Sequence, residues 1–321
     1  MDTTDRPHGG SARIVVGVDG SAAARAALRA ALAAAVARGA RVEVVSSYAA
    51  DLYWLGGAGV VVPVVEDVRG ATRRRAEELL ATVRTEVPGA ASVEAAVEVT
   101  LDPAAAALVA GSVGAELVVV GNRGRGAVRS ALLGSVALHT VTHAHCPVLV
   151  VHPSSGEPAQ PPRVVVGVDG SAAARVALAA AVEEAAVLGA DVRAVATYAV
   201  TDYWVDLSTV VLPSREEIRD DLQRRVAESV EAVLAGRPGD GRAPRVEIEV
   251  VEGAAADVLV ERARDAALLV VGSRGRGSVR GLLVGSVALH CVMHAAGPVL
   301  VVHPVRRPAE GTVGPAASAL V

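Results

Sequence analysis

The chain has 321 residues, of which 52% are hydrophobic, 21% charged and 2% aromatic, and its formal net charge is −4. This balance predicts a packed core, excludes wholesale disorder and gives no reason to expect a nucleic-acid partner. No apolar run reaches the roughly 18 residues that span a bilayer, and the polar N-terminus lacks the apolar segment of a secretory signal. We therefore expect a cytoplasmic protein without membrane contact. All 31 basic residues are Arg, which excludes chemistry that needs a Lys.

Two copies of one unit make up the chain. RIVVGVDG at residues 13–20 returns as RVVVGVDG at residues 163–170, and SAAAR follows both. A period of about 150 residues is that of a whole domain, which predicts a duplicated fold and not a solenoid. The predicted organisation is a flexible tail over 1–12, a domain over 13–153, a Pro-rich linker over 154–162, a domain over 163–304 and a flexible tail over 305–321.

Short apolar runs alternate with helical segments in the first copy. Ile14–Val18 predicts a buried strand, Ser21 can cap the helix that follows, and Gly39 ends that helix. Five strands joined by crossover helices predict an α/β fold with a doubly wound parallel sheet in each copy. The further predicted elements are strand Val42–Ser47, a loop with Pro63 leading to a charged helix within Glu66–Glu86, strand Val93–Val99, a short helix capped by Asp102 with Pro103 in its first position, strand Leu117–Val120, a helix from Ser135 to about Ala144, and strand Pro147–Val151.

A glycine-rich loop follows the fourth predicted strand with the spacing G-x2-G-x9-G-S. Its residues are Gly121, Gly124 and Gly134-Ser135, and the second copy repeats the spacing at Gly272, Gly275 and Gly285-Ser286. Glycine allows positive φ and close approach of the backbone to a ligand. Successive N–H groups and a helix N-terminus together attract phosphate. The loop is neither a Walker A motif nor a dinucleotide fingerprint. A tight turn that binds nothing is the competing interpretation, and the duplication of the spacing weighs against it.

The combined motifs resemble the universal stress protein family in its tandem form. The matching segments are VGVDGS at Val16–Ser21, the loop from Gly121 to Gly126, GSVA at Gly134–Ala137, CPVLVV at Cys146–Val151, and their counterparts in the second copy. The resemblance implies strand order 3-2-1-4-5 in each domain. It also implies ATP, with or without Mg²⁺, at the carboxyl ends of the first and fourth strands, where the strand order reverses.

The resemblance also implies a role for each matching residue. Asp19 would contact the adenosine side, although a carboxylate that only holds the turn remains an open alternative. Ser47 would lie near adenine, and the glycines with Ser135 would hold the phosphates, with charge from Arg123 and Arg125. No catalytic and no metal-binding residue is predicted. The predicted nucleotide-binding residues are Gly17, Asp19, Ser47, Gly121, Asn122, Arg123, Gly124, Arg125, Gly126, Gly134, Ser135 and Val136, and, in the second copy, Gly167, Asp169, Thr197, Gly272, Ser273, Arg274, Gly275, Arg276, Gly277, Gly285, Ser286 and Val287.

Several other residues were weighed as candidate sites. His139 and His143 stand four apart, as do His290 and His294, but no third ligand accompanies either pair, so structural or interface histidines are predicted. Cys146 and Cys291 are predicted to be free thiols. The Tyr-Trp pairs at residues 53–54 and 203–204 leave three interpretations open: packing on their own domain, a lid over the nucleotide, or an oligomer contact.

The leading functional hypothesis is an ATP-binding regulatory protein of the stress response. The alternatives are a slow ATPase or autokinase of the same fold, and a structural protein with vestigial sites. Val148–Val151 and Val299–Val302 are apolar strands at sheet edges, and an uncovered apolar edge invites pairing. The two domains are therefore predicted to pair with each other through these strands about a pseudo-twofold axis, with a homodimer or an unidentified regulatory protein as further partners.

Overall fold

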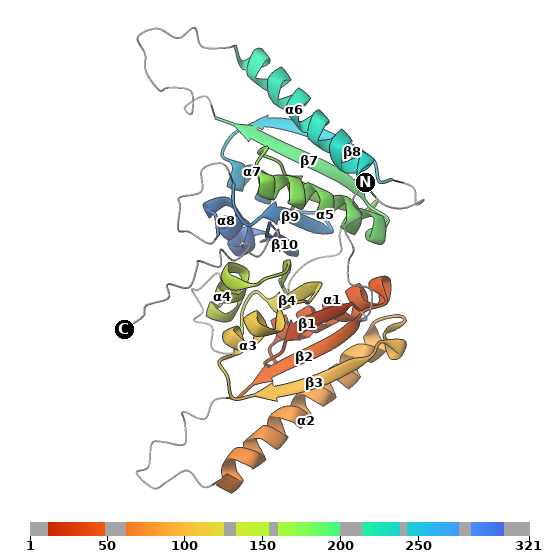
Figure 1. The fold of residues 1–321 in the computed structure, drawn as a ribbon, viewed down its shortest axis with the longest axis vertical. Coiled ribbons are helices and arrows are strands. Elements are labelled where there is room, and N and C mark those ends of the chain that lie inside the picture. The colour runs from red at the N-terminus through yellow and green to blue at the C-terminus, as the bar shows by residue number, and fades with distance from the viewer. Residues whose placement is uncertain are drawn as a thin grey trace, which may run out of the picture.

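Two similar halves build one continuous sheet with helices on both faces (Figure 1). The computed structural model describes residues 12–48, 62–124, 133–153, 160–199, 214–237, 243–275 and 284–304. The first half contains β1 (Arg13–Gly17), α1 (Ala22–Arg38), β2 (Arg41–Ser47), α2 (Val62–Glu86), a short 3₁₀ helix η2 (Ala90–Ser92), β3 (Ala95–Thr100), α3 (Ala104–Gly111), β4 (Leu117–Gly121), α4 (Ser135–His143) and β5 (Val148–Val151).

The second half repeats the same order without the 3₁₀ helix among its described residues. It contains β6 (Arg163–Gly167), α5 (Ala172–Leu188), β7 (Asp191–Tyr198), α6 (Arg215–Ala235), β8 (Val246–Glu252), α7 (Ala255–Arg262), β9 (Leu268–Gly272), α8 (Ser286–His294) and β10 (Val299–Val302).

The strand order across the sheet is β3-β2-β1-β4-β5-β10-β9-β6-β7-β8. Each half thus has the predicted order 3-2-1-4-5, and strands within a half are parallel. β5 and β10 pair antiparallel, with Leu149 opposite Leu300, so the two apolar edges cover each other. This confirms the predicted pairing of the fifth strands.

Local sequence explains why α1 begins and ends where it does. The Ser21 hydroxyl oxygen accepts a hydrogen bond from the Ala24 N–H at 3.1 Å, which satisfies one of the free donors of the first turn. Gly39 ends the helix with φ of 63°, a left-handed conformation that a side chain disfavours. Leu28 and Leu32 on the inner face are fully buried. The second half repeats both caps, at Ser171 and Gly189.

Two apolar layers enclose the sheet, and both run through the two halves. One layer contains Leu28 of α1 and Leu178 of α5 together with Val16 and Val166 of the central strands. The other contains Leu108 of α3 and its counterpart Leu259 of α7, with buried residues of α4 and α8. Because the apolar layers are continuous, burial of the β5–β10 seam contributes to one shared core.

Three predicted boundaries were wrong. α2 begins at Val62, so the helix starts before the charged stretch. β3 begins at Ala95 because Val93 closes the 3₁₀ turn of η2. Asp102 does not cap α3: its carboxylate accepts from the Thr100 hydroxyl at 3.2 Å, and Pro103 occupies the N-cap position without a side-chain hydrogen bond.

Among the described residues, one ion-pair cluster crosses between the halves, and it lies on one side of the seam. Arg38 at the end of α1 pairs with Glu116 of its own half, with 3.2 Å between Nε and Oε1, and with Glu184 of α5 in the other half. The residues equivalent to Arg38 and Glu184 by the repeat are Leu188 and Ala34, which cannot form the pair. The contact between the halves is therefore electrostatically asymmetric.

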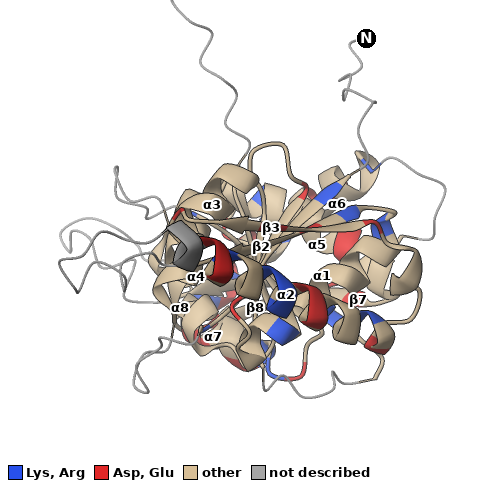
Figure 2. Cartoon of the chain, turned by 90° about the horizontal axis from the view of Figure 1, so that it is seen from below, with Lys and Arg blue, Asp and Glu red and all other residues tan. Residues whose placement is uncertain are grey.

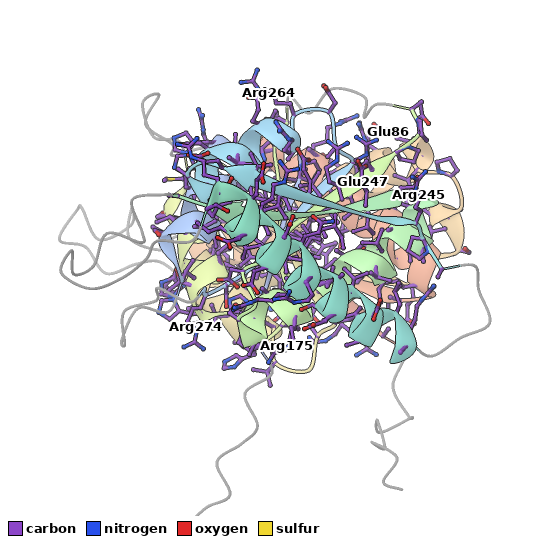
Figure 3. All side chains as sticks on the ribbon, turned by 90° about the horizontal axis from the view of Figure 1, so that it is seen from above. Glu86, Arg175, Arg245, Glu247, Arg264 and Arg274 are labelled. Atoms are coloured by element: carbon purple, nitrogen blue, oxygen red, sulfur yellow. The ribbon has the colours of Figure 1, made fainter. Side chains whose placement is uncertain are left out.

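Charged side chains gather on the outer helices. Figure 2 shows acidic and basic residues interspersed along α2, a pattern typical of a solvated helix face. Figure 3 shows Arg175 and Arg264 at the periphery and directed outward, and Arg264 pairs with Glu261 one turn earlier. Among the described residues, no helix combines the length and the apolar character needed to cross a membrane.

Candidate functional site

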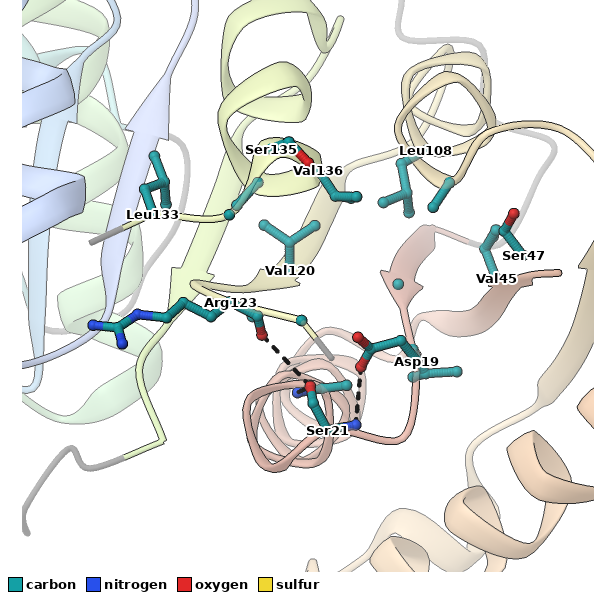
Figure 4. Close-up of a pocket in the computed structure, with 18 residues that line it drawn as sticks. Asp19, Ser21, Val45, Ser47, Leu108, Val120, Arg123, Leu133, Ser135 and Val136 are labelled. Atoms are coloured by element: carbon teal, nitrogen blue, oxygen red, sulfur yellow. Dashed lines mark hydrogen bonds between the residues drawn. The ribbon is translucent and has the colours of Figure 1, made fainter. Parts of the chain in front are cut away.

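A cavity of about 480 Å³ opens in the first half at the carboxyl ends of β1 and β4 (Figure 4). This is the point where the strand order reverses, because β2 and β5 lie on opposite sides of these two strands. Crevices at such reversals are the usual ligand sites of open α/β sheets. The lining residues are Gly17, Val18, Asp19, Ser21, Ala24, Val45, Ser47, Ala104, Leu108, Val120, Gly121, Arg123, Gly124, Leu133, Gly134, Ser135, Val136 and Ala137.

Asp19 is placed in the cavity wall by the turn between β1 and α1. Its Oδ1 accepts a hydrogen bond from the Ser21 N–H at 2.9 Å. The Ser21 hydroxyl in turn lies 3.5 Å from the carbonyl oxygen of Arg123 (Figure 4). Asp19 therefore holds the turn, as the alternative interpretation proposed, and also lines the cavity.

Glycine is required in the loop by close approach of neighbouring atoms. A Cβ atom at Gly124 would lie 2.5 Å from Oδ2 of Asp19, and one at Gly121 would lie 2.7 Å from the carbonyl carbon of Ala23. Neither glycine has positive φ, so that part of the prediction was wrong. The positive φ of this region belongs to Gly20, at 80°, in the turn beside Asp19. Side chains are excluded here by contact, and the strand-end backbone remains accessible.

Helix α4 points its N-terminus into the cavity. Its first residues, Ser135, Val136 and Ala137, all line the wall. An α-helix leaves its first N–H groups without partners inside the helix, and Gly134 at the N-cap supplies no side-chain acceptor for them. The Gly134 N–H itself donates to the carbonyl oxygen of Asn122 at 2.8 Å, which closes the glycine loop onto the helix. The positive end of the helix dipole therefore faces the cavity.

Two predicted residues lie differently from the prediction. The Arg123 side chain leads away from the cavity toward the second half, so only its main chain borders the first site (Figure 4). The Asn122 side chain is buried and is not part of the described wall. The main-chain N–H of Asn122 donates a hydrogen bond to the carbonyl oxygen of Val151 at 2.9 Å, which connects the loop to the end of β5. Arg125 and Gly126 lie outside the described residues.

The opposite end of the cavity is apolar, and sequence reasoning missed it. Val45 of β2 and Leu108 of α3 face each other across this end, beside Gly17 at the end of β1. Ser47 also lines the wall, and its hydroxyl donates to the carbonyl oxygen of Asp102 at 2.6 Å. No local motif marks Val45 or Leu108. Only their positions at the carboxyl end of a strand and on a neighbouring helix could have indicated them.

The second half repeats the geometry of the loop. Oδ1 of Asp169 accepts from the Ser171 N–H at 2.9 Å, and a Cβ atom at Gly275 would lie 2.7 Å from Oδ2 of Asp169. The Gly285 N–H donates to the Ser273 carbonyl oxygen at 2.7 Å at the start of α8. The Ser273 side chain is buried, like that of Asn122. The other predicted residues are Gly167 and Gly272 at the ends of β6 and β9, Thr197 in β7, Arg274 in the loop and Val287 in α8, whereas Arg276 and Gly277 lie outside the described residues.

The remaining candidate residues are the histidine pairs, the cysteines and the Tyr-Trp pairs. His139 stacks on His143 with 4.1 Å between ring centroids, and His290 and His294 repeat this stack. In the part of the chain that the structure describes, no group of three His, Cys, Asp or Glu side chains could hold a metal ion. Cys146 is a buried free thiol, and burial raises its pKa to about 12. The Tyr-Trp pairs lie outside the described residues.

A family model described as the universal stress protein family matches this chain twice, over residues 11–152 and 162–303. The chain belongs to the universal stress protein family. Each match covers one half of the structure, including the glycine loop and the helix that follows it. The tandem organisation inferred from the sequence repeat is thus that of two universal stress domains in one chain.

Relatives with the same two-part length support this membership. A universal stress protein of Mycolicibacterium smegmatis is 33% identical over 301 residues, which cover 91% of this chain and 97% of the relative. A universal stress protein of Mycobacterium tuberculosis is 39% identical over 226 residues, which cover 68% of both chains. The fold is similar to that of a universal stress protein from Archaeoglobus fulgidus, with a TM-score of 0.59 and 21% identity over 91% of this chain and 96% of that chain.

Proposed function

We propose that this universal stress protein is a regulatory protein that binds ATP in each half, at the cavity of the first half and at the equivalent place in the second. The single observation that carries the proposal is the start of α4. Its first turn has no side-chain cap and faces the cavity. The glycines of the neighbouring loop stand where a side chain would collide, and they leave the loop backbone open to contact with a ligand. Such an arrangement suits the phosphates of a nucleotide.

The shape of the cavity also suits a nucleotide. A volume of about 480 Å³ falls within the range of small-molecule sites. The apolar end at Val45 and Leu108 suits a flat base, and the end at Gly124 and Ser135 suits phosphate. Asp19 lies between them, where its carboxylate can accept hydrogen bonds from ribose hydroxyls. The cavity thus has a dry end and a donor-rich end in the order of a nucleotide's own parts.

The charge around the cavity makes the backbone the main phosphate-binding group. Asp19 is the one carboxylate among the described lining residues, and the Arg123 guanidinium leads away. Binding of phosphate would therefore rest on the N–H groups of the loop and of the first turn of α4, with the Ser135 hydroxyl as a further donor. Mg²⁺ accompanying the nucleotide would neutralise phosphate charge.

The regulatory proposal and its enzyme alternative differ in the fate of the nucleotide. Protein purified without added nucleotide is denatured, and the released nucleotide is identified by chromatography; ATP is then added to fresh protein and ADP is followed over hours. The proposal expects the nucleotide released on denaturation to be ATP. It also expects added ATP to form ADP far more slowly than the roughly 1–10³ per second of ordinary enzymes. Protein-dependent formation of ADP that Asp19→Asn abolishes would support the slow-ATPase or autokinase alternative. No nucleotide and no binding of added ATP would contradict both.

A further inference from the structure

Two histidines cross the seam between the halves in a reciprocal arrangement. His152 directly follows β5, and His303 directly follows β10. The His152 Nε2 lies 3.2 Å from the carbonyl oxygen of Val292 in α8 of the other half. The His303 Nε2 lies 2.8 Å from the carbonyl oxygen of Val141 in α4. The two contacts are related by the repeat, so the pseudo-twofold axis of the molecule passes between them.

Each histidine binds the last turn of the other half's helix. Val141 and Val292 lie in the final turns of α4 and α8. Carbonyl groups in the last turn of a helix have no N–H donor further along the same helix. α4 and α8 lie side by side across the seam in Figures 1 and 2. Because a carbonyl oxygen only accepts, each imidazole donates through Nε2–H in this arrangement. The contacts therefore link the halves by hydrogen bonds at both ends of the β5–β10 pair.

The surroundings of both imidazoles oppose a second proton. His152 is 7% exposed, and His303 is partly buried with an Nδ1 atom that finds no hydrogen-bond partner among the described residues. Burial, the larger cause, lowers the pKa of both histidines below the ordinary value, and nearby charged or titratable groups lower it further: Arg123 for His152, and Arg274 and His145 for His303. Main-chain hydrogen bonds from the other half, at Val292 and Gly297 for His152 and at Val141 and Cys146 for His303, act against this lowering without cancelling it.

We propose that His152 and His303 form a proton-sensitive latch that holds the two halves together at neutral pH and loosens on acidification. When the halves separate, both imidazoles enter water and regain the ordinary pKa of about 6.5. At mildly acidic pH the open state then binds protons at these histidines, whereas the closed state does not. Closure is thus unaffected above about pH 7 and weakens as pH falls below about 6.5, by up to tenfold per pH unit for each histidine.

The latch has a structural route to both candidate sites. α4 begins at the first cavity and ends at His303, and α8 begins at the second glycine loop and ends at His152. Each of these two helices therefore has one end at a candidate site and the other end at the seam. Loosening of the seam would free the seam end of both helices. The latch itself does not depend on nucleotide binding, and the experiment that tests it uses no nucleotide.

The test compares hydrogen exchange of the peptides that contain β5 and β10 between pH 7.5 and 5.0, corrected for the intrinsic pH dependence of exchange. The test variant is His152→Gln with His303→Gln, because the Gln amide can donate from a similar position but takes up no proton. The matched control is His143→Gln with His294→Gln, since these exposed histidines lie on the same two helices.

The wild-type protein and the control should lose protection at the seam by about 5- to 30-fold between pH 6.5 and 5.5, the lower value applying when one histidine titrates and the upper value when both do. The test variant should keep its protection across this range. If the double variant does not fold by circular dichroism, the two single variants decide the matter, and each should lose no more than about tenfold. A wild-type seam whose protection does not change with pH, or Gln variants that lose protection as steeply as the wild-type protein, would overturn the proposal.

Discussion

Replacement of Gly124 by Ala isolates the contact on which the geometry of the first site depends. The added Cβ atom would lie 2.5 Å from Oδ2 of Asp19, whereas ordinary contacts begin near 3.4 Å. The carboxylate or the loop must therefore move by about 1 Å, because a Cβ atom essentially never approaches another atom closer than 3.0 Å. Such a movement breaks the 2.9 Å hydrogen bond from the Ser21 N–H to Oδ1 of Asp19 or pushes the loop into the cavity.

The size of the effect follows from the bond at risk. A hydrogen bond to a charged group contributes about 1.5–3 kcal/mol, so the free energy of unfolding should fall by about this amount. An equal loss in binding would weaken ATP at the first site by roughly 10- to 150-fold. Urea unfolding followed by circular dichroism measures the first quantity. Isothermal titration calorimetry measures the second and should show one tight site in place of two.

Two matched variants show whether contact with Asp19 is the cause. Gly275→Ala should produce the same loss at the second site, since its Cβ atom would lie 2.7 Å from Oδ2 of Asp169. Gly236→Ala at the end of α6 should change ATP binding at neither site, because its Cβ atom meets nothing closer than 3.4 Å. The reasoning is refuted if Gly124→Ala retains wild-type stability and two equal sites, or if it abolishes both sites together.

Three further predictions concern the seam and the thiols. A double-mutant cycle of Arg38→Leu and Glu184→Ala should give a coupling energy of about 1 kcal/mol in urea unfolding, and a value near zero would show that the ion pair contributes nothing. Cysteines placed at Leu149 and Leu300 should form a disulfide within one chain on mild oxidation, visible as faster migration on a non-reducing gel; only chain-to-chain disulfides would contradict the pairing. Cys291, whose pKa burial raises to about 12, should resist a thiol reagent at pH 8 in the folded protein and react after unfolding, and rapid reaction of the folded protein would contradict its burial.

The fold was largely predictable because the sequence contains the same pattern of strands, caps and helices twice. Apolar strands, the Ser21 cap and Gly39 are local signals, and their return one domain later separates them from chance. The continuous apolar runs at Val148–Val151 and Val299–Val302 also predicted the seam, because an uncovered edge has few other ways to be buried. Boundaries such as that of β3 were wrong because a 3₁₀ turn competes with the strand through a few hydrogen bonds that composition does not reveal.

The site was predictable as a set of main-chain positions but not as a set of side-chain directions. The spacing from Gly121 to Ser135 indicated which backbone faces the cavity. The direction of the Arg123 side chain depends on a neighbouring half, and its departure from the cavity has no local signal. The same holds for His152, whose partner lies 140 residues away, and for Arg38, whose partner lies 146 residues away. Contacts of this range are set by the pairing of the halves, which the sequence predicts without its side-chain detail.

Native mass spectrometry of the full chain titrated with ATP tests the central claim most directly, because it counts bound nucleotides in each molecule. The account predicts a species with two ATP molecules at saturation, a species with one ATP for Gly124→Val or Gly275→Val, and none for the double variant. A wild-type chain that binds no nucleotide, or single variants that still bind two, would contradict the assignment of a nucleotide site to each half.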